Sequence, residues 1–223
     1  MRIALFGGTF DPIHSGHVRA AKAAARKLRL DRILFVPSGH PPHKVKGRLT
    51  PFSHRYAMVA LACTEDPRFV ASLLESPTPD GRPHYSVDTV RTAKRLLERG
   101  DELFFLIGVD AFRDLPQWKD HRRLLDSVSF IVVSRPGFAL AEIARTIPPD
   151  LVRKLPGRIP PNTLRMRHTS LQVLQDVDIA IASRNIRDAI RAGRRVTGLV
   201  PPLVEQYILK EGLYRPAASG RKE

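Results

Sequence analysis

Short apolar runs that end at glycine or proline alternate with helical segments along most of this chain, and this alternation constrains the fold more than any other feature. The first apolar run, residues 3–6, ends at Gly7-Gly8, and the second, residues 33–36, ends at Pro37. Between them, residues 17–28 are rich in alanine and carry basic residues on one side, which is typical of a helix. A buried strand, a helix and a second buried strand in this order predict a parallel βαβ unit.

The same alternation continues toward the carboxyl end of the chain. Further strands are expected at residues 69–73, 103–107, 128–133, 171–174 and 177–182. Further helices are expected at residues 52–63, 87–99, 183–191 and 202–210, and in a stretch that ends at Leu124-Leu125. Strands that alternate with helices predict an α/β fold with a doubly wound parallel sheet, which binds its ligands at the carboxyl ends of the strands.

A chain of 223 residues fits one domain over residues 1–213, with a small C-terminal helical portion from about residue 183. Residues 214–223 are expected to form a disordered tail. The loop at 38–48 is polar and rich in proline and is expected to be mobile, whereas residues 138–170 form a proline-rich excursion with no clear periodicity.

The charge of the chain favours anionic partners. Lysine and arginine number 37 against 22 aspartate and glutamate residues, for a net charge of +15. Phosphorylated small molecules and nucleic acid both fit this charge, but aromatic residues are only 7% of the chain, so stacking platforms for nucleic acid are few. No apolar run is long enough to span a membrane, and the single Cys63 excludes an internal disulfide, so a cytoplasmic location is expected.

The stretch GGTFDPIHSGH, residues 7–17, follows the first expected strand and concentrates the chemistry of the chain. Glycines after a strand let backbone N–H groups approach a ligand closely. The next helix begins near Gly16-His17, and its N-terminus offers free donors and partial positive charge, which suit a phosphate. If the first helical turn starts near His14, the rings of His14 and His17 face one side. The stretch therefore predicts a phosphate site.

Other uses of this stretch are less consistent with its residues. The dinucleotide pattern GxGxxG and the Walker pattern with its terminal GK[ST] are both absent. The two histidines lack the third ligand of the metalloprotease pattern, which argues against zinc. A purely structural turn remains an alternative for any single residue.

Several motifs together resemble one family. GGTFDPIHSGH is similar to the (H/T)xGH signature region of the nucleotidyltransferase superfamily, in the version found in bacterial nicotinate-nucleotide adenylyltransferases. Further matches to that family, in its order and over nearly the whole chain, are PPHK at 41–44, YSVDT at 85–89, GVD at 108–110 followed by Trp118, RPG at 135–137, IASRNIR at 181–187 and VPPLVEQYI at 200–208.

The resemblance implies a Rossmann-like nucleotidyltransferase fold and the transfer of an adenylyl group from ATP to nicotinate mononucleotide, giving deamido-NAD and pyrophosphate. It implies Mg²⁺ with ATP, no covalent enzyme intermediate, and a possible homo-oligomer. His14 and His17 are the implied catalytic residues. The implied ATP and phosphate residues are Gly7, Gly8, Thr9, Phe10, Lys44, Ser183, Arg184 and Arg187. The implied mononucleotide residues are His43, Tyr85, Ser86, Asp110, Trp118 and Arg135, with Trp118 stacked on the nicotinate ring.

The chain departs from the family pattern at four positions. Ser86 replaces a threonine, Ala111 replaces a serine, and Ala182 and Arg184 stand where the late motif has serine and threonine. The change at position 184 puts a long cation at the phosphate end of the site, so we expect Arg184 to help Arg187 hold the triphosphate, with a solvent-exposed side chain as the alternative. Another adenylyl- or cytidylyltransferase and an RNA-binding protein remain the rival functions.

Overall fold

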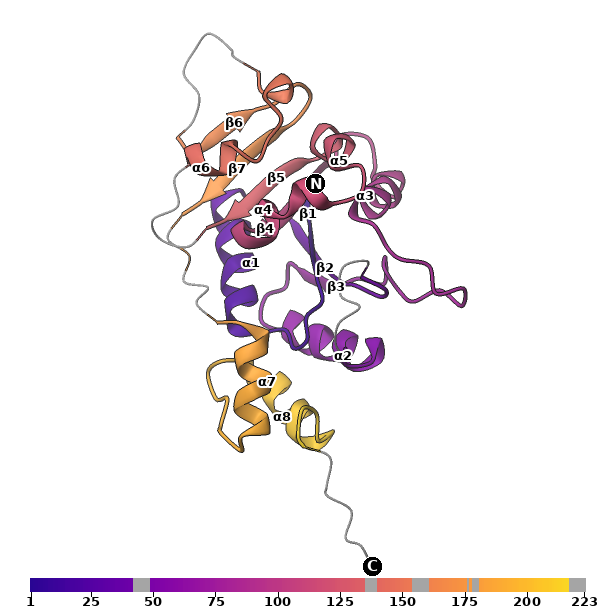
Figure 1. The fold of residues 1–223 in the computed structure, drawn as a ribbon, viewed down its shortest axis with the longest axis vertical. Helices are drawn as coiled ribbons and strands as arrows, with labels where there is room; N and C mark the ends of the chain where they lie inside the picture. Colours follow the sequence, from indigo (N-terminus) through magenta and orange to yellow (C-terminus); the bar gives the residue numbers. More distant parts are fainter. Residues whose placement is uncertain (42–48, 135–139, 154–160, 176, 178–180, 217–223) are drawn as a thin grey trace, which may run out of the picture.

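The computed structural model describes residues 1–223 except 42–48, 135–139, 154–160, 176, 178–180 and 217–223. In the described residues a single sheet of seven strands has the order β3-β2-β1-β4-β5-β7-β6 (Figure 1). Every neighbouring pair is parallel except β6 with β7. The strands are β1 (Arg2–Gly8), β2 (Arg32–Pro37), β3 (Phe69–Ala71), β4 (Glu102–Gly108), β5 (Ser129–Val133), β6 (Thr163–Arg165) and β7 (Ser170–Leu174).

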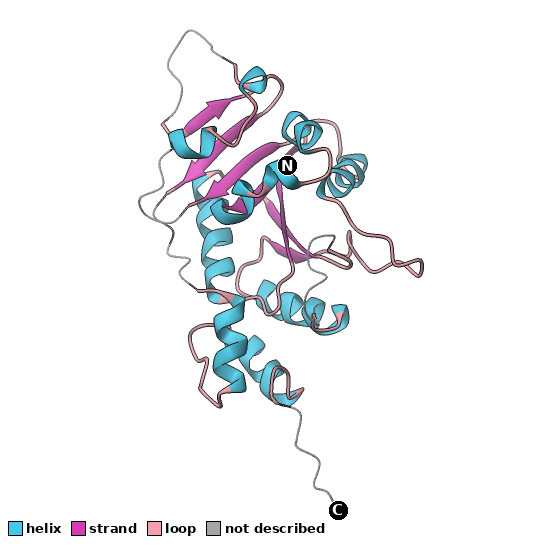
Figure 2. Ribbon diagram, in the orientation of Figure 1, coloured by secondary structure: helices cyan, strands magenta, loops and turns pink. Residues whose placement is uncertain are grey.

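Helices cover both faces of this sheet (Figure 2). The α-helices are α1 (Ser15–Lys27), α2 (Phe52–Cys63), α3 (Ser86–Arg95), α4 (Val109–Arg113), α5 (His121–Ser127), α6 (Leu140–Ala144), α7 (Ser183–Arg191) and α8 (Pro202–Lys210). Two short 3₁₀ helices, η1 (Leu115–Gln117) and η2 (Pro149–Leu151), join them. The described chain therefore has the doubly wound α/β fold that the sequence predicts.

The core consists of two apolar clusters, one on each face of the sheet. Successive side chains of a strand point to opposite faces, and in β1 Ala4 and Phe6 join one cluster while Ile3 and Leu5 join the other. The first cluster is covered by α1, α2, α7 and α8, and the second by α3, α4, α5 and α6. Burial on both faces explains why the central strands read as continuous apolar runs in the sequence.

The predicted helices at 52–63, 183–191 and 202–210 have the bounds of α2, α7 and α8. Helix α3 ends at Arg95 rather than at residue 99, because the N–H groups of Leu96 and Leu97 bond three residues back and tighten the last turn. Strand β6 lies inside the proline-rich excursion and was not predicted, since a three-residue edge strand leaves no periodicity to detect.

Two other expectations are corrected in the described residues. The strand expected at 177–182 is wrong for the residues of this segment that the structure describes, because Val177, Ile181 and Ala182 lie outside any strand. Tyr214 does not belong to a loose tail, since its hydroxyl donates to the Asp11 carboxylate at 2.7 Å. The loop expected to be mobile at 38–48 falls largely outside the described residues.

Cys63 is the last residue of α2 and is partly buried. Burial raises the pKa of its thiol to about 12, so the sulfur stays protonated at neutral pH and is a poor nucleophile. In the part of the chain that the structure describes, no helix combines the length and the apolar character needed to cross a bilayer.

Candidate active site

The family motifs meet at the carboxyl ends of β1 and β4. These two strands are neighbours, yet the chain reaches β2 and β3 on one side of β1 before it returns to β4 on the other. This reversal is the topological switch point at which doubly wound sheets bind ligands. Strand β1 ends at Gly8 and β4 ends at Gly108, so both glycine motifs lie at this switch point; the space between the segments that follow the two strands is called the crevice below, because a ligand crevice is expected there.

The loop between β1 and α1, here the phosphate loop (residues 7–14), is shaped by Phe10. The Phe10 side chain is 1% exposed, and its ring packs edge-on against Phe6 and His17. Its φ is +47°, a left-handed conformation that is unusual for a residue with a side chain. A Cβ at Gly8 would lie 3.1 Å from the Phe10 ring, so the glycine permits this close packing. Phe10 was expected among the ATP-binding residues, but only its backbone is available for that role.

His14 and His17 cap α1 reciprocally. His14 is the N-cap residue, and its Nδ1 accepts from the backbone N–H of His17, while Nδ1 of His17 accepts from the backbone N–H of His14. The two rings are stacked with centroids 3.7 Å apart, which confirms that they share one side of the first turn. A neutral imidazole whose Nδ1 accepts carries its proton on Nε2, so this capping arrangement selects the tautomer that donates through Nε2.

The charge state of His14 follows from its burial. The side chain is 6% exposed, and burial, together with the nearby charge of Arg19, lowers the pKa of His14 to about 4. At neutral pH the ring is therefore an uncharged hydrogen-bond donor in the folded protein.

This shift predicts a loss of stability in acid. The unfolded chain protonates His14 near pH 6.5, well above the folded pKa of about 4, so protons favour the unfolded state in that window. Between pH 7 and pH 5, the free energy of unfolding is expected to fall by about 2 kcal/mol through His14 alone. His14→Asn keeps an N-cap acceptor but does not titrate, so its urea unfolding should lack this component. An equal pH dependence in both proteins would contradict the assignment.

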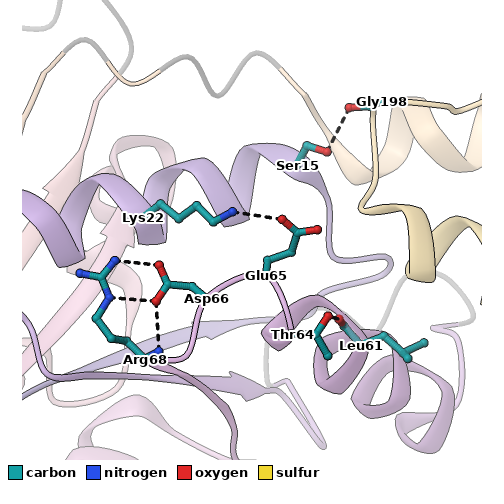
Figure 3. Close-up of polar contacts among 8 residues, drawn as sticks. All are labelled: Ser15, Lys22, Leu61, Thr64, Glu65, Asp66, Arg68 and Gly198. Carbon is teal, nitrogen blue, oxygen red and sulfur yellow. Dashed lines mark hydrogen bonds and ion pairs between the residues drawn. The ribbon is translucent and has the colours of Figure 1, made fainter.

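Contacts from distant segments hold the start of α1 in place (Figure 3). The Ser15 hydroxyl donates to the carbonyl of Gly198 at 3.0 Å, and the Ser15 backbone N–H donates to Leu199 at 2.9 Å. Further along the helix, Lys22 pairs with Glu65 at 3.0 Å. The direction in which the two imidazoles point is therefore set by the loop that precedes α8 and by the turn that follows α2.

Beneath the phosphate loop lies a polar cluster that sequence reasoning missed. Arg55 of α2 is 2% exposed, and it donates to the carbonyls of Thr9 and Thr50, each at 2.8 Å. Asp11 is 3% exposed and accepts from the Tyr214 hydroxyl. Burial lowers the pKa of Arg55, an effect that the Asp11 charge opposes. Burial and the same carboxylate raise the pKa of Tyr214 far above its usual value. This cluster fixes the shape of the loop from below.

The late motif reaches the same loop. Ser183 donates from its hydroxyl to the carbonyl of Pro12 at 2.9 Å, and Arg187 donates to the carbonyl of Asp11 at 2.6 Å. The N-cap residue of α7 is Ala182, and the Ser183 hydroxyl is turned to the phosphate loop instead of capping the helix. Arg184 is exposed beside them, on the first turn of α7. The structure thus brings the opening and late motifs together.

The second group of motif residues lies at the start of α3 and directly after η1. Tyr85 is the N-cap residue of α3, with no side-chain cap of its own, and Ser86 is the first residue of that helix. Lys119, which was not anticipated, places its Nζ 4.2 Å from the centre of the Tyr85 ring. Trp118 is half-buried and meets Phe105 edge-on at 6.4 Å, so part of the indole packs on the core and part stays accessible.

Asp110 lies neither at the end of a strand nor at the N-cap position of a helix. Strand β4 ends at Gly108, which is also the N-cap of α4, and Asp110 is exposed in the first turn of that helix. His43, Lys44 and Arg135 lie outside the described residues. No cluster of three or more potential metal ligands occurs among the residues that are described.

Comparison with known proteins identifies the family. The model of the cytidylyltransferase-like family matches residues 5–189. A probable nicotinate-nucleotide adenylyltransferase of Thermus thermophilus is 43% identical over 215 residues, which cover 96% of this chain and 100% of the relative. One from Syntrophotalea carbinolica is 38% identical over 218 residues, which cover 96% and 98% of the two chains.

A solved structure agrees in fold. Nicotinic acid mononucleotide adenylyltransferase of Plasmodium falciparum, complexed with NaAD, superimposes with a TM-score of 0.71 at 19% identity, covering 96% of this chain and 97% of the other. Together with the switch point and the motifs that lie at it, these matches show that the chain belongs to the cytidylyltransferase-like family and, within it, to the nicotinate-nucleotide adenylyltransferases.

Proposed function

We propose that this protein transfers the adenylyl group of ATP to nicotinate mononucleotide, giving deamido-NAD and pyrophosphate, and so acts in NAD biosynthesis. The observation that carries the mechanism is the pair of stacked imidazoles at the N-terminus of α1, directly after the glycine loop at the switch point. Both rings and the helix N-terminus favour an anion at this place.

The reaction is a single in-line displacement. A phosphate oxygen of the mononucleotide attacks the α-phosphorus of ATP, the bond from that phosphorus to the α–β bridging oxygen breaks, and pyrophosphate leaves with the electron pair. No residue forms a bond to the substrate, so the protein contributes alignment and stabilisation of charge. His14 and His17 donate to the phosphate oxygens as negative charge moves toward the leaving group.

Other residues of the ATP side hold the triphosphate. Backbone N–H groups of the phosphate loop, from Gly7 to Phe10, approach the phosphates, and Arg187 lies at the far side of that loop. Lys44 is assigned to the same subsite. Mg²⁺ would enter with the ATP substrate and would neutralise phosphate charge there, a mode of binding that needs few protein ligands.

The mononucleotide occupies the side of the crevice formed by α3 and the segment after η1. We assign the nicotinate ring to the accessible part of Trp118, and its carboxylate to the N–H groups at the start of α3 near Tyr85 and Ser86. Asp110, His43 and Arg135 are assigned to the ribose and phosphate of this substrate. The test is pyrophosphate release with ATP and nicotinate mononucleotide, and the proposal fails if a folded protein releases none. Phosphopantetheine in place of the mononucleotide tests the rival transferases.

Arg184 supplies a prediction about the ATP subsite. A cation at a helix N-terminus is unfavourable in the empty protein but favourable once a triphosphate arrives. Arg184→Ala is therefore expected to raise KM for ATP about three- to tenfold, as for loss of one charge-assisted hydrogen bond, and to leave KM for the mononucleotide unchanged. The empty protein should also gain slightly in thermal stability.

Arg191→Ala is the matched control for this variant. Arg191 lies two turns further along the same face of α7 and pairs with Asp188. The control variant therefore removes the same charge from the same helix face, but farther from the phosphate loop. An unchanged KM for ATP in folded Arg184→Ala, or an equal effect from Arg191→Ala, would show that Arg184 is only a surface residue.

A further inference from the structure

A buried carboxylate, that of Glu75, lies between the segment that follows β2 and helix α3. Glu75 is 6% exposed. One carboxylate oxygen, Oε2, accepts from the Ser38 hydroxyl at 2.9 Å, and the other, Oε1, accepts from the Thr89 hydroxyl at 2.7 Å. Both of these partners are neutral, so no cation among them offsets the cost of burying the charge. An apolar side chain would fill the same space at lower cost, so packing alone does not account for a carboxylate here.

The first partner, Ser38, connects Glu75 to the loop that is assigned to ATP. Ser38 directly follows β2, and its backbone N–H donates to the carbonyl of Gly8 at 2.9 Å. Gly8 belongs to the phosphate loop. One side of the Glu75 carboxylate is therefore separated from that loop by a single residue.

The second partner, Thr89, connects Glu75 to the helix start that is assigned to the mononucleotide. Thr89 lies in the first turn of α3, and its backbone N–H donates to the carbonyl of Tyr85 at 3.0 Å. Its hydroxyl also lies 3.2 Å from the same carbonyl. The other side of the carboxylate is thus one residue away from Tyr85, the N-cap of the helix to which the nicotinate carboxylate is assigned.

Close backbone packing supports this link. An added Cβ at Gly39 would lie 2.2 Å from the carbonyl oxygen of Glu75, so only glycine fits where the two segments meet. The backbone N–H of His84 donates to the carbonyl of His40 at 3.1 Å, which joins the segment after β2 to the start of α3 a second time. The Glu75 side chain therefore sits in a rigid frame, and its length sets the distance between the groups that it bridges.

We infer that Glu75 is a positioning residue that holds the start of α3 in register with the phosphate loop, and thereby aligns the mononucleotide phosphate with the α-phosphorus of ATP. Glu75 touches neither substrate and acts through Ser38 and Thr89. This inference rests on the proposed function, since it assigns the two ends of the link to the two substrates.

The test compares Glu75→Leu with Glu75→Gln. Leucine fills the space but removes both carboxylate acceptors, so the Ser38 hydroxyl loses this partner and the Thr89 hydroxyl keeps only the longer bond to the Tyr85 carbonyl. The loss is expected to raise KM for nicotinate mononucleotide about tenfold and to lower kcat, because an unmade buried hydrogen bond costs about that factor. KM for ATP is expected to stay within about twofold, because the bond from Ser38 to Gly8 is made by the backbone. Glutamine keeps an acceptor and the length of the side chain, so it should restore most of the activity.

Binding is measured separately from turnover. Trp118 is the only tryptophan of the chain, so quenching of its fluorescence reports the Kd for the mononucleotide without any reaction. Glu102→Leu is the matched control: it removes another glutamate, which pairs with Arg2 at the amino end of β4, opposite the strand end that faces the site, and should change neither KM. If Glu75→Leu does not fold, Thr89→Val removes only one hydroxyl in a side chain of the same shape. It should raise KM for nicotinate mononucleotide by a smaller factor and leave KM for ATP unchanged.

The outcomes separate the two proposals. If the unaltered protein releases no pyrophosphate from ATP and nicotinate mononucleotide, the proposed function fails. If the unaltered protein is active but Glu75→Leu or Thr89→Val changes both KM values equally, or neither, Glu75 is a structural residue and the inference is overturned.

Discussion

Replacement of His17 by alanine is expected to lower kcat for adenylyl transfer about a hundredfold, the usual effect of losing one preorganised donor to a developing negative charge. The stacked arrangement with His14 places both imidazoles at the positive end of α1, where the triphosphate is assigned. Because the interaction grows as charge moves toward the leaving group, kcat should fall much more than KM for ATP rises. Steady-state rates of pyrophosphate release at saturating mononucleotide measure this directly.

The same variant loses one half of the reciprocal cap, which is expected to cost about 1 kcal/mol of stability. The control is therefore a histidine with a comparable structural contact elsewhere. His54 of α2 meets the Tyr207 hydroxyl at 2.9 Å, so His54→Ala should lower the melting temperature but keep kcat near its normal value. A folded His17→Ala protein with near-normal turnover would remove His17 from the mechanism.

Discrimination between nicotinate and nicotinamide mononucleotide is the second large effect expected. The N–H groups of the first residues of a helix have no partner within it, and Tyr85, the N-cap of α3, offers no side-chain oxygen to them. Lys119 adds positive charge above the Tyr85 ring. A nicotinate carboxylate would satisfy these donors, whereas a carboxamide can turn an NH₂ group toward them and carries no charge.

We therefore expect kcat/KM for nicotinate mononucleotide to exceed that for nicotinamide mononucleotide by about a hundredfold or more, as for sites whose polar groups are left unpaired by the wrong substrate. The measurement uses one enzyme preparation, saturating ATP and each mononucleotide in turn. Deoxy-ATP at a fixed mononucleotide serves as a control, since it alters only the other subsite. Equal kcat/KM values for the two mononucleotides would show that the start of α3 does not read the carboxylate.

The elements predicted most accurately are those with a glycine or proline close to the residue at which the element begins or ends. Helix α7 ends at Arg191 shortly before Gly193, and α8 begins at the residue after Pro201, so local chemistry marks these bounds. The central strands were found because burial on both faces gives them continuous apolar runs. Strand β6 was missed because it has three residues and is defined by its pairing with β7, which no local pattern encodes.

In the candidate site, His14 and His17 share one side of the first turn of α1, as their spacing of three predicts, while their catalytic role stays a prediction. Phe10 and Ser183 belong to the same motifs, but tertiary packing turned their side chains to the core and to the Pro12 carbonyl. The roles of His43, Lys44 and Arg135 stay predictions.

By itself the sequence determined the order of the central strands and of the helices between them, the doubly wound architecture and the motifs at the ends of strands, because the spacing of apolar residues and the positions of glycine, proline and charge act over a few residues. Only the tertiary structure decided which distant groups support the site. Arg55 beneath Thr9, Tyr214 on Asp11 and Glu75 between Ser38 and Thr89 join segments that lie far apart in the chain. A buried polar group must find its hydrogen-bond partner wherever the fold brings one, and that choice is made by packing across the whole molecule rather than by any neighbour in the sequence.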